Sequence, residues 1–386
     1  MSKPFKIMRN KLIRRLSVGL LPLLVPLMMI FDGCHYANPS IKHASKPTAD
    51  SSSLLSYAKG FAIFHEKHQT RVVVYDPWQK GKVLAQYYLV KGRPGKGQIH
   101  IPLNKAAVFS ATQLDALDRL DLLSHVMGVS EATYIKNKSV QKLLKQHKIT
   151  ELAASENYYI EKIIEKAPQA IFFSPYQGHQ SLPTALSSIL AIPYLDFMES
   201  SPLGRAEWIK FTAAFFGKQA LADSLFNRVE KQYNALLQLT DSVSYRPTVF
   251  SDKYFNGQWY IAGGRSYIAR LFRDAGADYI WKDNKQRGSF PLDFETVFTK
   301  AQHADFWRIV GTFGAKPSYT ALASENKLYT NFKAYRLHHI LYCDPEATAY
   351  FETSPLEPQE ILADFIKAFH PGLLPHYKPH YYKILP

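Results

Sequence analysis

Apolar positions follow two different spacings along this chain, and the changes between them divide it into segments. The runs 71–75 and 83–90 are rich in β-branched and aromatic residues and are bounded by turn sequences, which predicts antiparallel strands. From Lys105 onward, short strand-like runs alternate with stretches of helical spacing, and the same alternation resumes after Asp241. This alternation is typical of α/β lobes.

One helix-and-strand pattern occurs in both halves of the chain. Segments 160–167 and 294–301 each place apolar residues at i, i+3, i+4 and i+7, and a strand-like run follows each. Glu161 and Glu295 follow the first apolar position, so both carboxylates are expected off the apolar stripe and in solvent. Asp293 is placed to cap the second helix. The repeat predicts two similar lobes, although unrelated α/β units also share such short patterns.

A longer helix is predicted between the two lobes. Segment 218–239 keeps helical spacing without an internal Gly or Pro, and Gly217 precedes it. Such a helix would be about 33 Å long, enough to span both lobes. Shorter helices are predicted at 155–166, 182–190, 266–275 and 358–369. The strand-end loops 110–112 and 174–179 are where sheets of this kind hold ligands.

The N-terminus has the pattern of a secretory leader. Six basic residues precede an apolar run, 16–31, which is shorter than the roughly 20 residues of a membrane span and contains two prolines. The run ends at Gly33 and Cys34, which resemble a bacterial lipoprotein cleavage box, although Asp32 departs from the small neutral residue usual there. We therefore predict a signal peptide over 1–33 and acylation of Cys34. The alternative is an ordinary signal peptide followed by an incidental Cys.

Length and composition divide the remaining chain. A chain of 386 residues is long for one core, so two lobes are expected after a flexible tether over 34–53, which is rich in Ser, Pro and Lys. The boundaries predicted are 54–201 for the first lobe with its leading hairpin, 202–240 for linker helices and 241–386 for the second lobe.

Charge and cysteine content restrict the function. The formal charge is +15, and the leader holds six basic residues and one acidic residue, so the mature chain carries +10. This basicity fits an anionic ligand or an anionic membrane surface, while a secreted lipoprotein argues against nucleic acid. With Cys34 acylated, Cys343 has no partner for a disulfide and is expected to be a small buried residue.

Several phrases together carry a family resemblance. They are the box at Cys34, YAKGF and VVVYDPW in the hairpin region, SPLGRAEWIKF before the long helix, and WYIAGGRSYIARLFRDAGADYIWKD followed by PLDFETVF. In this order they resemble the ABC-transporter substrate-binding lipoproteins for iron complexes (ferric siderophore or haem) and vitamin B12, in a variant found in Bacteroides-like bacteria.

The resemblance implies a fold and a set of partners. The fold would be α/β, with two Rossmann-like lobes joined by one long rigid helix (class III periplasmic binding protein) and an N-terminal β-hairpin region. The protein would be a monomer in the periplasm, anchored to the membrane by lipid, with an ABC permease and its ATPase as partners. It would hold no intrinsic cofactor, and its transported ligand would be an iron chelate or cobalamin.

The resemblance also assigns roles to residues. Glu161 and Glu295 match the positions at which each lobe docks on the permease. A flat, partly apolar chelate between the lobes needs aromatic walls with a few polar groups. The candidates are Tyr176, Gln177, Trp259, Tyr260, Arg265, Phe290 and Trp307. For each aromatic residue, packing in the core is the competing interpretation. Arg265 follows two glycines at a helix start and can hold an anionic group.

Other classes of function have weaker support. The sequence lacks Gly-x-Ser-x-Gly, His-Glu-x-x-His and a dinucleotide-binding fingerprint, so an enzyme is not expected. A lipid-anchored module that binds glycans or proteins is the main alternative, with cleft aromatics stacking on sugars. No metal site is expected either, because His338 and His339 are adjacent and His376 and His380 lie in a Pro-rich tail.

Overall fold

A computed structural model describes residues 54–154, 157–176, 181–314 and 316–386 of the chain. All of these residues fall in one compact unit, Asp50–Pro386. The predicted signal peptide, the tether, Cys34 and Gln177 lie outside the described residues. None of the described helices combines the length and the apolar character that crossing a membrane requires.

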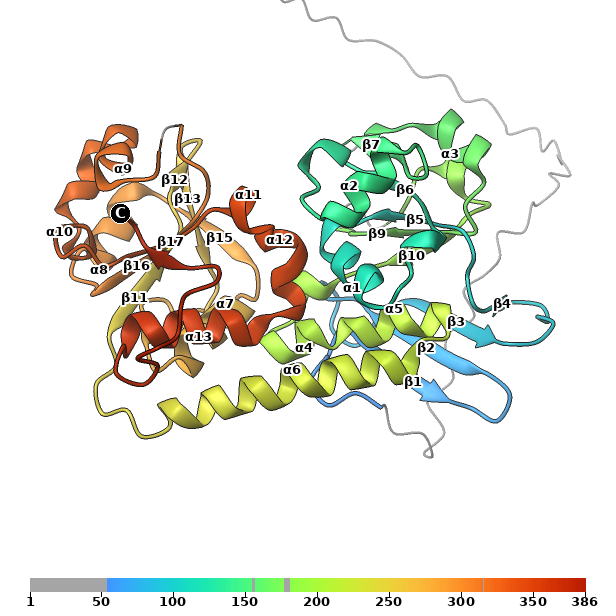
Figure 1. Ribbon diagram of the computed structural model, residues 1–386, viewed down its shortest axis with the longest axis horizontal. Coiled ribbons are helices and arrows are strands. Elements are labelled where there is room, and N and C mark those ends of the chain that lie inside the picture. Colours follow the sequence, from blue (N-terminus) through green and yellow to red (C-terminus); the bar gives the residue numbers. More distant parts are fainter. Residues whose placement is uncertain (1–53, 155–156, 177–180, 315) are drawn as a thin grey trace, which may run out of the picture. The chain divides into compact units, whose positions relative to one another are not determined.

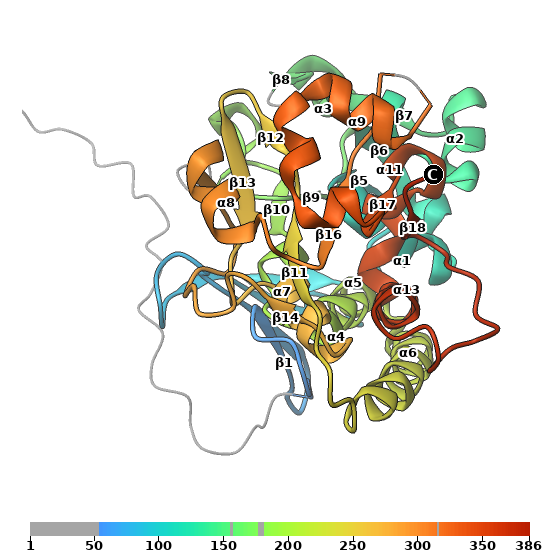
Figure 2. The same cartoon turned by 90° about the vertical axis from the view of Figure 1, so that its left-hand side faces the viewer.

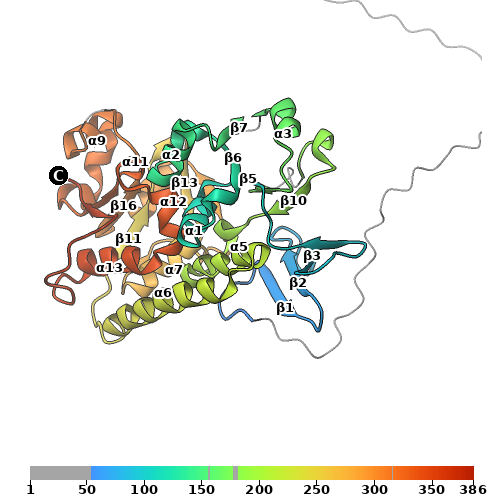
Figure 3. The same ribbon diagram turned by 45° about the vertical axis from the view of Figure 1, so that its right-hand side comes forward.

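The described chain begins with the small sheet that the sequence predicts. Strands β1 (Phe61–His65), β2 (Thr70–Tyr75) and β3 (Val83–Val90) pair antiparallel, and β4 (Gln98–His100) adds to β3 in parallel. The three antiparallel strands lie side by side in Figure 3. Phe61 packs against the Trp208 ring with 4.7 Å between ring centroids, so this sheet shares a core with the first lobe.

The first lobe is built on a six-stranded sheet in the order β10-β9-β5-β6-β7-β8. All neighbouring strands run parallel except the short β8 at the edge. The strands are β5 (Ala106–Phe109), β6 (Val126–Ser130), β7 (Thr150–Ala154), β8 (Asn157–Tyr158), β9 (Ala170–Phe173) and β10 (Leu190–Pro193). The helices are α1 (Leu114–Arg119), α2 (Lys138–Lys145) and α3 (Ile160–Lys166).

Two predicted helices of this lobe are wrong in extent. The helix predicted at 155–166 begins only at Ile160, because β8 precedes it. The helix predicted at 182–190 is a single turn of 3-10 helix, Thr184–Leu186, before β10. Pro183 and the two serines at 187 and 188 supply little helix propensity there, and only Leu190 of the predicted segment enters the edge strand.

Three helices connect the lobes. They are α4 (Pro202–Ala206), α5 (Trp208–Phe216) and α6 (Gln219–Thr240), and Gly217 separates the last two with a left-handed φ of 68°. The 22 residues of α6 confirm the predicted long helix within one residue at each end. Ala222 and Phe226 pack in the core of the first lobe, whereas Tyr233 packs in that of the second. One apolar face of α6 therefore joins both cores.

The second lobe contains a five-stranded sheet, β14-β11-β16-β17-β18, and a three-stranded antiparallel sheet, β12-β13-β15. β11, β16 and β17 follow one another in the larger sheet (Figure 2), which is parallel except for β18. The strands are β11 (Thr248–Ser251), β12 (Tyr254–Phe255), β13 (Gln258–Ala262), β14 (Asp278–Tyr279), β15 (Ser289–Leu292), β16 (Phe306–Val310), β17 (Ile340–Cys343) and β18 (Lys383–Ile384).

Helices cover these sheets and close the lobe (Figure 1). They are α7 (Tyr267–Asp274), α8 (Phe294–Ala301), α9 (Tyr319–Glu325), α10 (Lys333–Arg336), α11 (Pro345–Thr348), α12 (Tyr350–Thr353) and α13 (Pro358–Phe369). α8 and α13 match the predicted bounds, and Asp293 caps α8 by accepting a hydrogen bond from the backbone N–H of Thr296. The helix-and-strand repeat of the sequence thus corresponds to α3 with β9 and α8 with β16.

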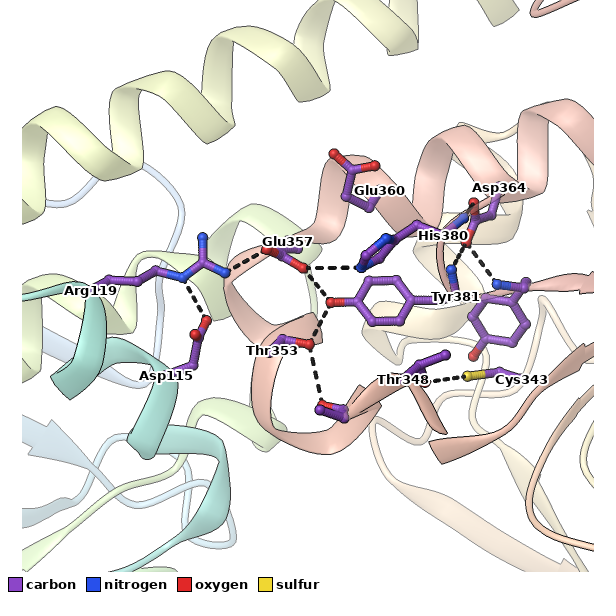
Figure 4. A network of polar contacts seen from close by, with 12 residues as sticks. Asp115, Arg119, Cys343, Thr348, Thr353, Glu357, Glu360, Asp364, His380 and Tyr381 are labelled. Carbon is purple, nitrogen blue, oxygen red and sulfur yellow. Dashed lines mark hydrogen bonds and ion pairs between the residues drawn. The ribbon is translucent and has the colours of Figure 1, made fainter. Parts of the chain in front are cut away.

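Polar contacts between side chains and backbone groups also join the two lobes away from α6. Arg119 of α1 lies between Asp115 of its own helix and Glu357 of the second lobe (Figure 4). Burial raises the pKa of Asp115 to about 6, although Arg119 acts in the opposite direction. The Glu352 carboxylate of α12 accepts hydrogen bonds from the backbone N–H groups of Lys136 and Asn137, the latter at 2.8 Å. These contacts fix the lobes at a second place besides α6.

Candidate ligand-binding site

The carboxyl ends of the parallel strands in both lobes lead into two adjoining cavities. Ala111 follows β5, Glu131 follows β6, Gly311 follows β16 and Pro345 follows β17, and all four line a cavity of about 450 Å³ that takes residues from both lobes. Gly311 also lines a second cavity of about 700 Å³, mostly within the second lobe. Ligands of open α/β sheets bind at this edge, so the pair of cavities is the candidate site.

A buried arginine borders the larger cavity. The guanidinium of Arg308, on β16, donates from Nη1 to Asp252 Oδ1 at 2.7 Å and from Nη2 to the Tyr382 hydroxyl at 2.7 Å. Its side chain is only 7% exposed. Nε also donates to the Tyr382 hydroxyl at 3.0 Å, and Nη2 donates to the Tyr350 hydroxyl at 3.4 Å. Of the five N–H donors, one on Nη1 therefore has no acceptor among the described residues, and it can meet an anionic group of a ligand.

Aromatic side chains face the smaller cavity from both lobes. Tyr134, in a turn after β6, is 70% exposed, and Phe351, on α12, is 56% exposed. Large aromatic surfaces are costly to leave in water unless something covers them. Their positions on opposite lobes suit the two faces of one flat ligand.

The larger cavity continues this aromatic lining. Phe197, Phe255 and Tyr260 all line it and are all exposed. Of the eight large aromatic side chains that are exposed in the described part of the chain, five therefore line the two cavities. This concentration distinguishes the site from the rest of the described surface.

The backbone is unusual at the same place. Glu131, Asp252 and Ala349 line the cavities, and each has a positive φ, between 49° and 70°, without being glycine. A residue with a Cβ in the left-handed region costs roughly 1–3 kcal/mol, which surrounding contacts must offset. At Asp252 the offset includes its ion pair with Arg308 and a hydrogen bond from the indole of Trp307 to its carbonyl.

A buried polar chain connects the first lobe to the larger cavity. The Thr112 hydroxyl donates to Asp196 Oδ1 at 2.9 Å, and Arg205 Nε donates to Asp196 Oδ2 at 2.8 Å. The Arg205 guanidinium lies over the Tyr267 ring at 4.7 Å from its centroid, and Tyr267 lines the cavity. This chain positions the wall of the cavity near the linker helices.

Two of the sequence-predicted ligand residues belong to the core. Trp259 and Trp307 are both fully buried, and their rings pack against Phe250 and against each other. Their indole N–H groups donate to the backbone carbonyls of Ser251 and Asp252 at 2.9 and 2.7 Å. They support the strand end beneath the cavity, and neither has exposed surface with which to contact a ligand.

The remaining candidates are distributed over several places. Tyr260 lines the larger cavity, and Phe290 is half-buried against the core of the second lobe. Arg265 is exposed and lines a separate pocket. Tyr176 is 42% exposed just beyond β9, and Gln177 lies outside the described residues.

The two predicted docking glutamates occupy equivalent places in their helices. Glu161 and Glu295 are exposed in the first turns of α3 and α8. Ile164, on the turn after Glu161, is 57% exposed. Leu328, which is 51% exposed, lines a pocket of about 270 Å³ together with Glu295. Each carboxylate is thus next to an exposed apolar side chain.

Within the described part of the chain, no group of three or more His, Cys, Asp or Glu side chains could hold a metal ion. His339 Nδ1 lies 3.2 Å from the carbonyl oxygen of Asp305, and His338 packs on the ring of Tyr319. Cys343 is a free, fully buried thiol, as predicted, and burial raises its pKa to about 12.

Sequence reasoning missed several residues of the site. They are Tyr134, Phe255, Arg308 and Phe351. Tyr134 comes four residues after the end of β6, so the rule that ligands bind at strand ends could have found it. Phe351 follows β17 only after α11, and no such signal marks it. Arg308 has no such signal, because it lies inside a strand-like run where an aliphatic residue is the usual choice.

Comparison with known proteins places this geometry among related folds. A family model described as periplasmic binding protein matches residues 107–347. An uncharacterised lipoprotein of Methanocaldococcus jannaschii is 28% identical over 412 aligned positions that cover 95% of each chain. The assignment to a Bacteroides-like variant stays a prediction.

Solved structures share the fold at low identity. A periplasmic binding protein from Veillonella parvula superposes with a TM-score of 0.59 and 13% identity, covering 78% of this chain and 98% of that one. A periplasmic heme binding protein from Pseudomonas aeruginosa superposes with a TM-score of 0.55 and 15% sequence identity. The match covers 73% of this chain and 97% of that one. This chain therefore shares its overall fold with these binding proteins.

Proposed function

Since this chain belongs to the family of periplasmic binding proteins, which are binding proteins rather than enzymes, we propose that it captures a metal chelate between its lobes and delivers it to an ABC permease. The ligand is an iron chelate, either a ferric siderophore or haem, or else cobalamin. The protein acts as a lipoprotein held at the periplasmic side of a membrane through Cys34.

One observation carries this proposal: the exposed aromatic side chains gather at the strand ends of both lobes. Tyr134 and Phe351 border one cavity from opposite lobes, and Phe255 and Tyr260 line the next. Chelates of this class are broad and partly apolar, so stacking on aromatic faces covers most of their surface.

Charge in the larger cavity favours an anionic or electron-rich chelate. Arg287 and Arg308 line it, and Lys253 reaches it while pairing with Glu325. Asp252 is the one carboxylate among the lining residues, and it is paired with Arg308. We place an iron chelate with carboxylate or hydroxamate groups ahead of cobalamin for this reason.

Delivery to a permease is supported by the surfaces around Glu161 and Glu295. An exposed ion pair contributes only about 0–1 kcal/mol, so two glutamates alone would set orientation more than affinity. The exposed Ile164 and Leu328 beside them add apolar contact that a permease can bury. The relative from Methanocaldococcus jannaschii is named a lipoprotein, which supports the anchor.

The test is a binding screen against haem, several ferric siderophores and cobalamin, in which quenching of the intrinsic tryptophan fluorescence reports binding. For the tightest ligand, Tyr134→Ala and Phe351→Ala should each weaken binding about five- to tenfold, the effect of losing one stacked ring. Tyr75→Ala is the matched control, because Tyr75 is an exposed aromatic that lines neither cavity.

Two outcomes would argue against this proposed function. Equal loss of affinity in all three variants would mean that the aromatic cleft is not the site. Binding of oligosaccharides and of no chelate would favour the glycan-binding alternative, for which aromatic stacking is also suited.

A further inference from the structure

A strongly basic pocket lies on the second lobe beside the aromatic cleft, and Ser266 and Arg287 line both. Its volume is about 360 Å³. Six of its lining residues are cationic: Arg246, Arg265, Arg270, Arg273, Lys282 and Arg287. Asp278 is the one carboxylate among them. No other described cavity gathers so many cations.

The fold brings these side chains together from four segments. Arg270 and Arg273 lie on one face of α7, and Arg265 precedes its N-cap, Ser266. A Cβ on Gly264 would lie 2.4–2.5 Å from the carbonyl oxygens of Trp281, Lys282 and Asn284, so only glycine allows these two backbone segments to meet. This close approach places Lys282 on the same pocket as Arg265.

Half of the positive charge has no acidic partner. Lys282 pairs with Asp278 at 2.7 Å, and Arg270 pairs with the buried Asp274 at 2.7 Å. Arg273 is 3.7 Å from that same carboxylate and is 64% exposed. Arg246, Arg265 and Arg287 have no carboxylate of the described residues within ion-pair distance, although the charge of Arg287 acts on the buried Glu199 and opposes the rise of its pKa that burial causes. Such a concentration of like charge destabilises the fold unless an anion neutralises it.

The lining differs in kind from that of the cleft. The pocket shares only Ser266 and Arg287 with the larger cavity. Its one aromatic residue, Tyr279, is buried, so the pocket has no exposed ring on which a flat chelate can stack. Guanidinium groups match phosphate oxygens with paired hydrogen bonds. We infer that this pocket binds the phosphate group of an anion other than the cleft ligand.

Two sources can present such a phosphate. Clusters of four to eight Lys and Arg near a membrane bind anionic phospholipid headgroups, and a chain anchored at Cys34 would be held close to that surface. A soluble phosphate compound is the other source. Both require the same basic pocket, and neither depends on which chelate occupies the cleft.

Calorimetry of the full chain in neutral detergent separates the two sources. One titration uses inorganic pyrophosphate, and the other uses neutral micelles doped with phosphatidylglycerol. The test variant is Arg265→Gln with Arg273→Gln, both exposed, in which the buried Asp274 keeps its closer ion pair with Arg270 at 2.7 Å. The control is Lys142→Gln with Lys145→Gln, two exposed lysines of α2 that change the net charge equally.

Affinity should fall about tenfold or more in the test variant and stay unchanged in the control, because charge-assisted hydrogen bonds are lost only at the pocket. Such a loss with pyrophosphate assigns a soluble phosphate, and a loss with doped micelles alone assigns the headgroup. Absence of binding to both probes, or equal weakening in the test and control variants, would overturn the inference.

Discussion

Asp305 connects three segments of the second lobe through a single carboxylate. Its Oδ2 accepts hydrogen bonds from the backbone N–H and the hydroxyl of Thr248 at 2.8 and 2.7 Å, and its Oδ1 accepts one from Lys333 Nζ at 2.6 Å. Burial alone would raise the pKa of Asp305, but these donors lower it from 3.8 to about 2. The ionised carboxylate is therefore favoured by folding.

This pKa shift makes a prediction for stability against pH. Because the folded pKa lies below the unfolded one, Asp305 contributes stability above about pH 4 that is lost as the pH falls toward 2. In urea denaturation at pH 7, the Asp305→Asn variant should have a lower free energy of unfolding than the native chain. This difference in unfolding free energy should become smaller below pH 4. The exposed Asp283→Asn serves as a control. A constant difference across that range would contradict the assignment.

At this scale the sequence could locate a pair of aromatic residues but not their roles. Trp259 and Tyr260 are neighbours on β13, so one must face the core and the other must face away. The alternation of side chains along a strand does not say which of the two residues faces the core. The register of β13 against β15 decides it: Trp259 is buried and Tyr260 is 46% exposed. Arg308 could not be predicted, because its partners Asp252 and Tyr382 come from distant parts of the chain.

At the scale of elements, the predicted helices that the structure confirms are those whose sequence marks them clearly. α6, α8 and α13 have sustained helical spacing, and a capping residue or a glycine marks an end in two of them. The helix predicted at 182–190 is wrong, because its few apolar residues fit a turn before a strand equally well. Short elements of this kind are settled by the neighbours they pack against.

The helices α3 and α8 carry the docking prediction. Changing Glu161 and Glu295 together to Arg should abolish ligand uptake by cells, because both carboxylates would meet the permease with the wrong sign of charge. Ligand affinity should remain unchanged, since neither residue lines the cleft cavities. The control is Glu165→Arg with Asp241→Arg, both exposed and neither lining the cleft cavities. Normal uptake by the Glu161/Glu295 variant would remove these residues from the interface.

At the scale of the whole molecule, the lobes are held at two places. α6 has no internal Gly or Pro, and its Val229 packs against the cores of both lobes. Glu352 and Glu357 add polar contacts from the second lobe to the first. A cleft supported in this way is largely formed before the ligand arrives, so little binding energy is spent on reordering.

Limited closure is the corresponding prediction. Small-angle scattering of the chain with and without its tightest ligand should show a change in radius of gyration of about 1 Å or less. The variant Glu352→Ala, which removes one set of contacts, should increase the radius of the ligand-free chain. A large compaction on binding would mean that α6 is not a stiff connection.

A crystal structure of the complex with the tightest-binding chelate is the sharpest test of ligand binding between the lobes. We expect the chelate to lie between Tyr134 and Phe351, with an anionic group within hydrogen-bond distance of the Arg308 guanidinium. A chelate bound elsewhere, with both aromatic side chains still in solvent, would contradict it.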